Sequence, residues 1–166
     1  MLIVNTDHGF FLGEHDFIGK NFPPIFDEVV HIPFFIHDPR VNKDGQRRSA
    51  LAQTVDLAPT LLSYFGLAPF EDIDGKDLSP VIIDDTPIHE DILYGIHGGQ
   101  INVDDGRYCY MRSPVDKDLP VYNMTLMPTL MRGFMRCEEI NQAQWVNGGR
   151  YANGNMVLQI PCKTTQ

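Results

Sequence analysis

A carboxylate and an imidazole stand side by side near the start of the chain, at Asp7 and His8. They follow the apolar run 2–4 and precede Gly9, which predicts a buried parallel strand ending at a polar corner. Open α/β sheets bind ligands at the carboxyl ends of their strands. An Asp–His pair there can ligate one divalent cation if other acidic residues converge on it. Asp-His-Gly is also a plausible turn without a ligand, and the pair alone leaves both interpretations open.

A longer pattern surrounds this pair and changes the balance. From Thr6 to Lys20 the chain reads Thr-Asp-His-Gly-x-x-Leu-Gly-Glu-His-x-x-x-x-Lys. Further along come Pro33-Phe34-Phe35-Ile36 and Val55-Asp56-Leu57-Ala58-Pro59-Thr60-Leu61-Leu62. This order resembles the C-terminal half of the sulfatase family, in the alkaline-phosphatase superfamily. It is similar above all to the branch of iduronate and choline sulfatases, which has a histidine after the metal-binding aspartate. The resemblance is dense over residues 1–66 and thin beyond about residue 112.

The resemblance implies a role for each matched position. Asp7 corresponds to the carboxylate ligand of the family's single divalent cation, usually calcium, with Mn²⁺ and Mg²⁺ as alternatives, and His8 to a neighbouring ligand. Lys20 corresponds to the lysine that contacts the sulfate oxygens of the substrate. A sulfate ester gains negative charge on its leaving oxygen during attack at sulfur. A cation and a compact ammonium group would both stabilise that charge.

Two further histidines are candidate substrate-binding residues. His15 lies in the Gly-Glu-His part of the pattern, where it either lines the pocket or braces the loop, and bracing is the favoured interpretation. His97 is followed by Gly98 and Gly99 and could reach the leaving group of the substrate.

The chain also departs from the family pattern. Sulfatases convert a cysteine or serine in Cys/Ser-x-Pro-x-Arg to formylglycine, and this sequence contains no such motif. The tandem aspartates that complete the family's metal site have no counterpart either, since Asp84-Asp85 lies downstream in an expected solvated turn. We therefore expect a fragment of a sulfatase that supplies metal and sulfate contacts but is inactive alone. The formylglycine would belong to the parent enzyme.

The elements that must position these residues can be read from the apolar spacing. We expect a second buried strand at 33–36, and a helix at 54–65 that starts at Thr54 or Asp56 and ends before Gly66. Residues 67–90 look irregular. Short strands follow at 92–96, 101–103, 107–111 and 156–160, with an Asp105-Gly106 hairpin, polar turns over 113–155 and a weakly helical stretch from Met127 to Ile140.

These elements and the resemblance together define the expected fold class. It is α/β: the C-terminal part of an alkaline-phosphatase-like sandwich, with a partial mixed sheet and helices, plus a small antiparallel β subdomain. Residues 1–90 would belong to the catalytic domain, and residues 91–166 would form the subdomain with a C-terminal tail. A sheet cut in this way exposes an apolar face, so a homo-oligomer could bury it.

Composition excludes several other classes of protein. The chain is 43% hydrophobic, as in globular domains, and its net charge of −9 argues against nucleic acid as a partner. The only basic cluster, Gln46-Arg47-Arg48, is expected to be a solvated loop. No apolar run approaches the roughly 20 residues of a membrane span. Three widely spaced cysteines favour a reducing compartment such as the cytoplasm, although an export signal could lie in a missing N-terminal part.

Three functions remain open from the sequence. The first is hydrolysis of a sulfate ester, carried by a small molecule or a saccharide. The second is hydrolysis of a phosphonate or phosphate monoester by an enzyme of the same superfamily. The third is a non-catalytic binding or oligomerisation domain of sulfatase ancestry. Because the segment that would hold the nucleophile is not in the chain, the residues alone do not separate the first two.

Overall fold

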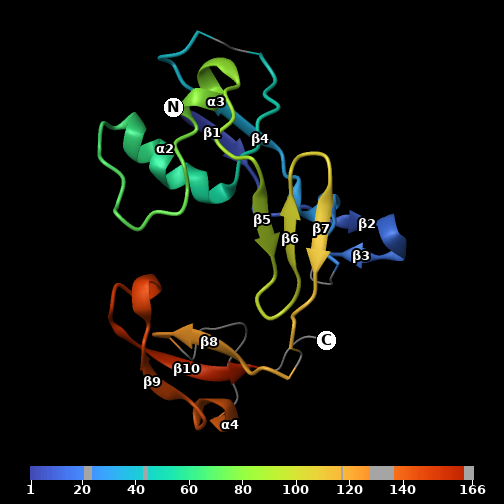
Figure 1. The fold of residues 1–166 in the computed structure, drawn as a ribbon, viewed down its shortest axis with the longest axis vertical. Helices are drawn as coiled ribbons and strands as arrows, with labels where there is room; N and C mark the ends of the chain where they lie inside the picture. The colour runs from blue at the N-terminus through green and yellow to red at the C-terminus, as the bar shows by residue number, and fades with distance from the viewer. Residues whose placement is uncertain (21–23, 43–44, 117, 128–136, 163–166) are drawn as a thin grey trace. The chain divides into compact units, whose positions relative to one another are not determined.

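The structure is a computed structural model that describes residues 1–20, 24–42, 45–116, 118–127 and 137–162. It is a mixed α/β arrangement of small antiparallel sheets and short helices, which form two compact units, Met1–Ser113 and Pro114–Gln166 (Figure 1). All the candidate site residues lie in the first unit. The expected boundary at residue 90 concerns the domains of the parent protein and stays a prediction.

Strand β1 (Leu2–Asn5) pairs with β4 (Phe34–His37) in an antiparallel ladder, with Val4 opposite Phe35. The expectation of a buried parallel strand was therefore wrong, although both strands exist. Parallel neighbours need a long crossover, usually a helix, whereas the connection here holds only a hairpin and one helical turn. The strand is also not buried, because Leu2, Val4 and Phe35 are 61%, 53% and 66% exposed.

The connection between these two strands forms a small core of its own. Strands β2 (Phe11–Leu12) and β3 (Ile18–Gly19) form a hairpin around the 3₁₀ turn η1 (Glu14–Asp16). Helix α1 (Asp27–Val30) follows, and Phe11, Ile25 and Val29 are buried against one another. Burying each such side chain stabilises the fold by about 1.5–3 kcal/mol. This cluster fixes the hairpin on α1.

The predicted helix over residues 54–65 is confirmed as the 3₁₀ turn η2 (Thr54–Asp56) followed by α2 (Leu57–Tyr64). Gly66 has a φ of 70°, and the Gly66 and Leu67 amides donate to the carbonyls of Ser63 and Leu62. This is the Schellman arrangement that favours glycine after a helix. The start differs from the expectation, because neither Thr54 nor Asp56 caps α2 through its side chain.

Helix α3 (Ser79–Asp84) occupies part of the segment that the sequence predicted to be irregular. Its C-terminal end is held by Arg48, whose guanidinium donates to the carbonyls of Val81 and Ile82 at 2.8 and 2.9 Å. Free carbonyls at a helix C-terminus attract cationic donors. Arg48 is thus a capping residue, and the expectation of a solvated basic loop was wrong for this side chain.

Asp85 makes the complementary contact from α3 back to the same loop. It has a left-handed φ of 63°, and its carboxylate accepts the backbone N–H groups of Ala50 and Ser49 and the Ser49 hydroxyl. These hydrogen bonds, from Ala50 first, hold the pKa of Asp85 below its ordinary value. Asp85 therefore anchors a loop, which the expectation of a solvated turn had missed.

A buried carboxylate joins three distant segments of the first unit. Asp56 is 0% exposed and accepts the backbone N–H groups of Gln53 at 2.7 Å and Lys76 at 2.8 Å. His89 Nε2 lies 2.9 Å from Asp56 Oδ2 and 3.0 Å from Oδ1. Thr60 extends the network, since its hydroxyl donates to the Asp56 carbonyl and accepts the Leu78 N–H. The carboxylate is fully supplied with donors, as a buried charge must be.

We predict that Asp56→Asn lowers the free energy of unfolding by roughly 3 kcal/mol, because the new amide NH₂ would face a backbone donor and leave it unpaired. Urea denaturation followed by circular dichroism measures the change. Asp91→Asn is the matched control, since Asp91 is exposed and should shift stability by no more than about 0.5 kcal/mol. Equal effects of the two substitutions would remove Asp56 from this structural role.

The first unit ends in a sheet ordered β5-β6-β7, formed by Ile92–Gly95, Ile101–Asp104 and Cys109–Arg112. The predicted antiparallel strands are confirmed here. Gly106 has a φ of 83° in the turn between the last two strands, as the Asp-Gly pair predicted. Leu93 N–H donates to the Gln53 side chain at 3.1 Å, which ties β5 to η2.

The second unit holds a sheet ordered β8-β10-β9, formed by Val121–Thr125, Met156–Cys162 and Gln144–Asn147. The unit also contains α4 (Cys137–Ile140) and the 3₁₀ turn η4 (Gly149–Ala152). The strand predicted at 156–160 is confirmed, whereas β8 and β9 lie where only turns were expected. Residues 128–136 of the predicted helical stretch lie outside the described residues.

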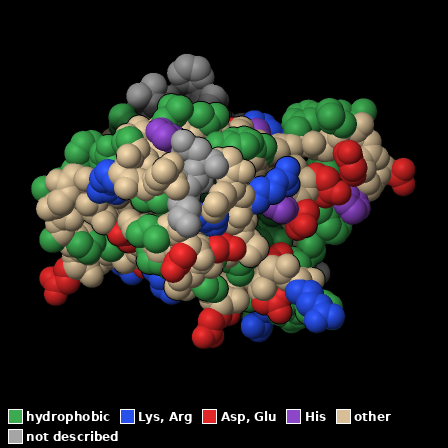
Figure 2. Space-filling model, turned by 90° about the horizontal axis from the view of Figure 1, so that it is seen from above, with side chains coloured by type: hydrophobic (Ala, Val, Ile, Leu, Met, Phe, Trp, Pro, Cys, Tyr) green, Lys and Arg blue, Asp and Glu red, His purple; other side chains and the backbone are tan. Residues whose placement is uncertain are grey.

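Hydrophobic side chains are spread over the surface as well as the interior. Figure 2 shows them over much of one face, between scattered acidic and basic groups. Within the described ranges, no helix is long and apolar enough to cross a membrane.

Candidate functional site

Asp7 and His8 lie in the loop that leaves β1, and Gly9 fixes that loop on α1. The Gly9 N–H donates to the Val29 carbonyl at 2.8 Å. A Cβ atom on Gly9 would collide with the carbonyl oxygen of Glu28, so only glycine fits this close approach. The glycine of the Asp-His-Gly motif is therefore required for steric reasons. Its contact with α1 sets the position of the Asp7 and His8 side chains.

The structure brings Asp7, His8 and Lys20 together. Lys20 Nζ lies 2.6 Å from His8 Nε2, and Asp7 Oδ2 lies 3.2 Å from the same nitrogen. Lys20 directly follows Gly19, whose φ of 147° turns the chain at the end of β3. Lys20 and His8 are 12 residues apart in sequence. The cluster thus brings together three side chains from two loops.

Thr6 orients the Asp7 carboxylate, a role that the sequence analysis did not assign. The Thr6 hydroxyl donates to Asp7 Oδ1 at 3.2 Å, and the His8 N–H donates to the same oxygen at 3.0 Å. Desolvation raises the pKa of Asp7, but the neighbouring His8 ring and these hydrogen bonds outweigh it, so the pKa lies below its ordinary value. Asp7 is therefore an anion at neutral pH with Oδ2 turned toward His8. The sequence signal for Thr6 was its place at the start of the Thr-Asp-His-Gly pattern, directly before the pair.

The cluster contains atom types that bind divalent cations, but too few of them for a complete coordination shell. A carboxylate oxygen and an imidazole nitrogen are both usual ligands, whereas calcium takes 6–8 oxygens. Across the ranges that the structure describes, no group of three or more His, Cys, Asp or Glu side chains could hold a metal ion. The ligand roles of Asp7 and His8 therefore stay predictions.

His15 lies on the hairpin with a left-handed φ of 56°, which is unusual for a residue with a side chain. Its ring stacks on Phe26 at 3.9 Å between centroids and meets the edge of Phe11 at 5.8 Å. His15 Nε2 also lies 3.3 Å from Glu28 Oε1. These contacts join the hairpin to α1. A substrate contact for His15 stays a prediction.

His97 lies in the turn between β5 and β6 and is exposed. This turn forms the lower end of the sheet in Figure 1, whereas β1 lies at the level of its upper end. The proposed contact of His97 with the leaving group therefore also stays a prediction.

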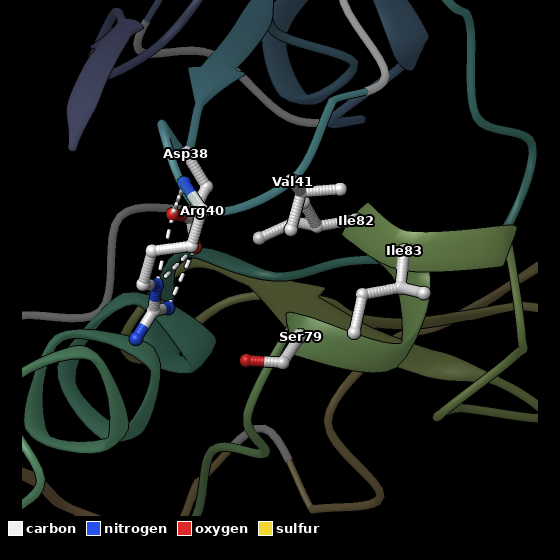
Figure 3. Close-up of a pocket in the computed structure, with 6 residues that line it drawn as sticks. All are labelled: Asp38, Arg40, Val41, Ser79, Ile82 and Ile83. Carbon is white, nitrogen blue, oxygen red and sulfur yellow. Dashed lines mark hydrogen bonds and ion pairs between the residues drawn. The ribbon is translucent and has the colours of Figure 1, made fainter.

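A surface cavity lies elsewhere in the first unit, and its charged side chains form an ion pair that supports the fold. It is lined by Asp38, Arg40, Val41, Ser79, Ile82 and Ile83 (Figure 3). Asp38 is 4% exposed and pairs with Arg40, whose Nη2 lies 2.6 Å from Oδ2 and whose Nε lies 2.9 Å from Oδ1. The guanidinium also covers the Tyr64 ring at 4.2 Å. Asp38 and Arg40 thus serve each other, and the Ser79 hydroxyl donates to Asp77 Oδ1 at 2.7 Å. None of the candidate site residues is among those that line the cavity.

The hydrogen bonds from the Arg40 side chain lower the pKa of Asp38. A carboxyl whose folded pKa is depressed stabilises the fold above its unfolded pKa of about 3.9, and that contribution is lost as pH falls through the folded pKa. We therefore predict that unfolding free energy declines between about pH 5 and pH 2, and that Asp38→Asn makes the decline shallower. Urea titrations at each pH test this, with Glu90→Gln, an exposed position, as control. An unchanged slope in Asp38→Asn would contradict the prediction.

Comparison with known proteins identifies the chain as a C-terminal portion of a sulfatase in the alkaline-phosphatase superfamily. The family model described as "N-sulphoglucosamine sulphohydrolase, C-terminal" matches residues 13–99, just over half of the chain, which therefore belongs to that family. The matched range includes His15, Lys20 and His97 and begins after Asp7 and His8.

Curated relatives agree with this assignment. The chain is 38% identical over 82 residues to an N-acetylglucosamine-6-O-sulfatase of Bacteroides thetaiotaomicron. This match covers 49% of the chain and 14% of the relative. It is 34% identical over 83 residues to an extracellular sulfatase SULF-1 homolog of Drosophila melanogaster, covering 49% and 7%. It is 31% identical over 88 residues to the multifunctional alkaline phosphatase superfamily protein PehA of Trinickia caryophylli, covering 52% and 17%. The matches thus span less than a fifth of each relative. No solved structure matches.

Proposed function

We propose that the protein to which this chain belongs hydrolyses a sulfate ester, and that the chain contributes the cation ligands Asp7 and His8 and the sulfate contact Lys20. The observation that carries this proposal is the cluster itself, in which Lys20 Nζ lies 2.6 Å from His8 Nε2 and Asp7 Oδ2 lies 3.2 Å from that nitrogen. The membership of the chain in a sulfatase family supports it.

The chemistry of the reaction explains why these groups belong together. A sulfate ester approaches as an anion, and charge moves to the leaving oxygen as the sulfur–oxygen bond breaks. A divalent cation, when bound, supplies Lewis-acid stabilisation of that charge. The Asp7 carboxylate and the His8 ring would hold the cation, and the Lys20 ammonium, a compact point charge, would hold a non-bridging oxygen.

The chain does not carry the whole of this machinery. It has no Cys/Ser-x-Pro-x-Arg segment, and its two cation ligands fall short of a complete shell. We propose that the remaining ligands and the nucleophile come from another part of the parent protein. That part, or a second copy of the chain, would also cover the exposed apolar side chains of β1 and β4.

A phosphate or phosphonate monoester is the second candidate substrate, favoured by the match to a multifunctional alkaline phosphatase superfamily protein. Both esters present anionic oxygens that a cation and a lysine can hold, so the residues of this chain suit either. A non-catalytic role for the chain is the remaining alternative, and the next experiment separates it from both.

We predict that the purified 166-residue chain does not hydrolyse an aryl sulfate above background, because it lacks a residue that can become formylglycine. Adding the N-terminal portion of a sulfatase with a mature formylglycine should restore turnover, measured by release of the phenolate. An aryl phosphate assayed in parallel identifies phosphatase chemistry. Turnover by the chain alone, or none by the reconstituted pair with either ester, would contradict the proposal.

Lys20→Ala in the full-length protein should lower kcat by about 10²–10³-fold, as removal of one well-placed donor to a developing anion does. Lys20→Arg should restore only part of the loss, because a planar guanidinium does not replace a point charge at one oxygen. Steady-state kinetics measure both variants. Lys76→Ala is the matched control, since the Lys76 ammonium donates to the Ile88 carbonyl. A near-normal kcat in Lys20→Ala would end the assignment of Lys20.

A further inference from the structure

Trp145 is the only tryptophan of the chain, and it lies largely in solvent on strand β9 of the second unit. It is 61% exposed, whereas tryptophan is a highly buried residue on average. The register of the sheet places Trp145 in one row with Leu158 of β10 and Thr125 of β8. Met156 and Asn147 form the next row on the same face, and both are exposed. The indole is therefore part of an open surface and not an isolated exposed side chain.

The strands of this sheet carry no charge. They read Val-Tyr-Asn-Met-Thr in β8, Gln-Trp-Val-Asn in β9 and Met-Val-Leu-Gln-Ile-Pro-Cys in β10, although 21% of the chain is charged. Edge strands such as β8 and β9 usually carry charges that prevent pairing with another chain. The polar side chains here are instead amides and hydroxyls, which donate and accept hydrogen bonds without attracting ions. These strands therefore suit a neutral polar ligand better than a nucleic acid or a basic peptide.

Asn147 supplies a hydrogen-bond donor beside the indole. Its Oδ1 accepts the Gly149 N–H at 2.8 Å, which holds the amide in place and leaves the NH₂ group as its donor. Asn147 and Trp145 are two residues apart on one strand, so their Cα atoms lie about 7 Å apart on the same face. A sugar ring presents apolar C–H groups on its faces and hydroxyls at its edge. A flat aromatic side chain with a fixed donor at this separation matches both parts of such a ring.

We propose that the face around Trp145 binds a saccharide, with one ring stacked on the indole and a hydroxyl oxygen accepting from the Asn147 amide. The inference rests on the proposed function for the identity of the ligand. It extends that function, because it makes a saccharide the carrier of the sulfate ester. The sheet recognises the sugar rings and not the sulfate group, since its strands offer no cationic side chain.

The test uses the fluorescence of the 166-residue chain, because its only tryptophan lies on this face. The probes are cellotriose and its sulfated form, with inorganic sulfate and glycerol as comparisons. We expect both saccharides to shift the emission to shorter wavelength in a saturable way, because a stacked ring removes water from the indole. Their midpoints should be similar, since the strands are uncharged. Sulfate and glycerol should give no saturable shift.

Amide NMR spectra establish that each variant is folded and measure its affinity for cellotriose. Trp145→Ala should weaken binding about tenfold through the loss of stacking. Asn147→Asp keeps an acceptor for the Gly149 N–H but removes the donor, so it should weaken binding about three- to tenfold. Tyr110→Ala is the matched control, because Tyr110 is a 65% exposed aromatic side chain on β7 of the first unit. It should leave the affinity unchanged.

Three results would overturn the inference. A saturable shift with inorganic sulfate alone would assign the face to an anion. A shift that grows with protein concentration, without saccharide, would assign it to a second copy of the chain. Unchanged emission with both saccharides, or equal affinities in the wild type and Trp145→Ala, would remove the saccharide from this face. Binding is measured without turnover, so each of these results leaves the proposed hydrolysis to its own assay, and a full-length protein without turnover would leave the binding result standing.

Discussion

The buried Asp56 carboxylate is the interaction on which the first unit depends. It lies at the start of α2, yet it accepts hydrogen bonds from Gln53, from the Lys76 backbone and from His89. Asp56 is 0% exposed, and an unpaired charge at such a position would cost several kcal/mol. The carboxylate is tolerated there because each of the three segments supplies a hydrogen-bond donor to it. The long irregular connection after α2 is therefore held by polar contacts more than by a large apolar core.

This network extends toward the candidate site through β5. His89 stands shortly before β5, and Leu93 N–H donates to Gln53, so the strand begins at a fixed place. Tyr94 then packs against the cluster of Phe11, Ile25 and Val29. That cluster carries the hairpin and α1, and α1 receives the Gly9 N–H that sets the Asp7–His8 loop. A continuous set of contacts thus leads from Asp56 to the Asp7–His8 loop.

The sequence predicted those features whose cause is local. Gly66 after α2 and Gly106 in the hairpin were identifiable because a positive φ restricts the residue type. The members of the candidate cluster were identified through the resemblance to the sulfatase family, and the structure brings Asp7, His8 and Lys20 together. Their roles as ligands and sulfate contact remain predictions.

Features set by distant partners were missed. Arg48 looked like a loop residue because its acceptors, the carbonyls of α3, lie 33 or more positions away. The predicted direction of β1 was wrong because an apolar run carries no information on the orientation of the neighbouring strand. Strands β8 and β9 were missed because each alternates only weakly; Trp145 and Met124, for example, are 61% and 51% exposed.

The strand that leads to the candidate site, β1, also carries an exposed apolar face. Leu2 and Val4 alternate along one face of β1, and Phe35 of β4 lies opposite Val4, so three large apolar side chains share a face. A contiguous apolar face of this kind marks a surface that another layer covers. We propose that the loop after the strand supplies two cation ligands, Asp7 and His8, whereas calcium takes six or more. A layer that covers the face would also approach the loop at the end of the strand, because four residues of strand span only about 13 Å. On that proposal, a single covering layer would both bury the apolar face and complete the ligand shell.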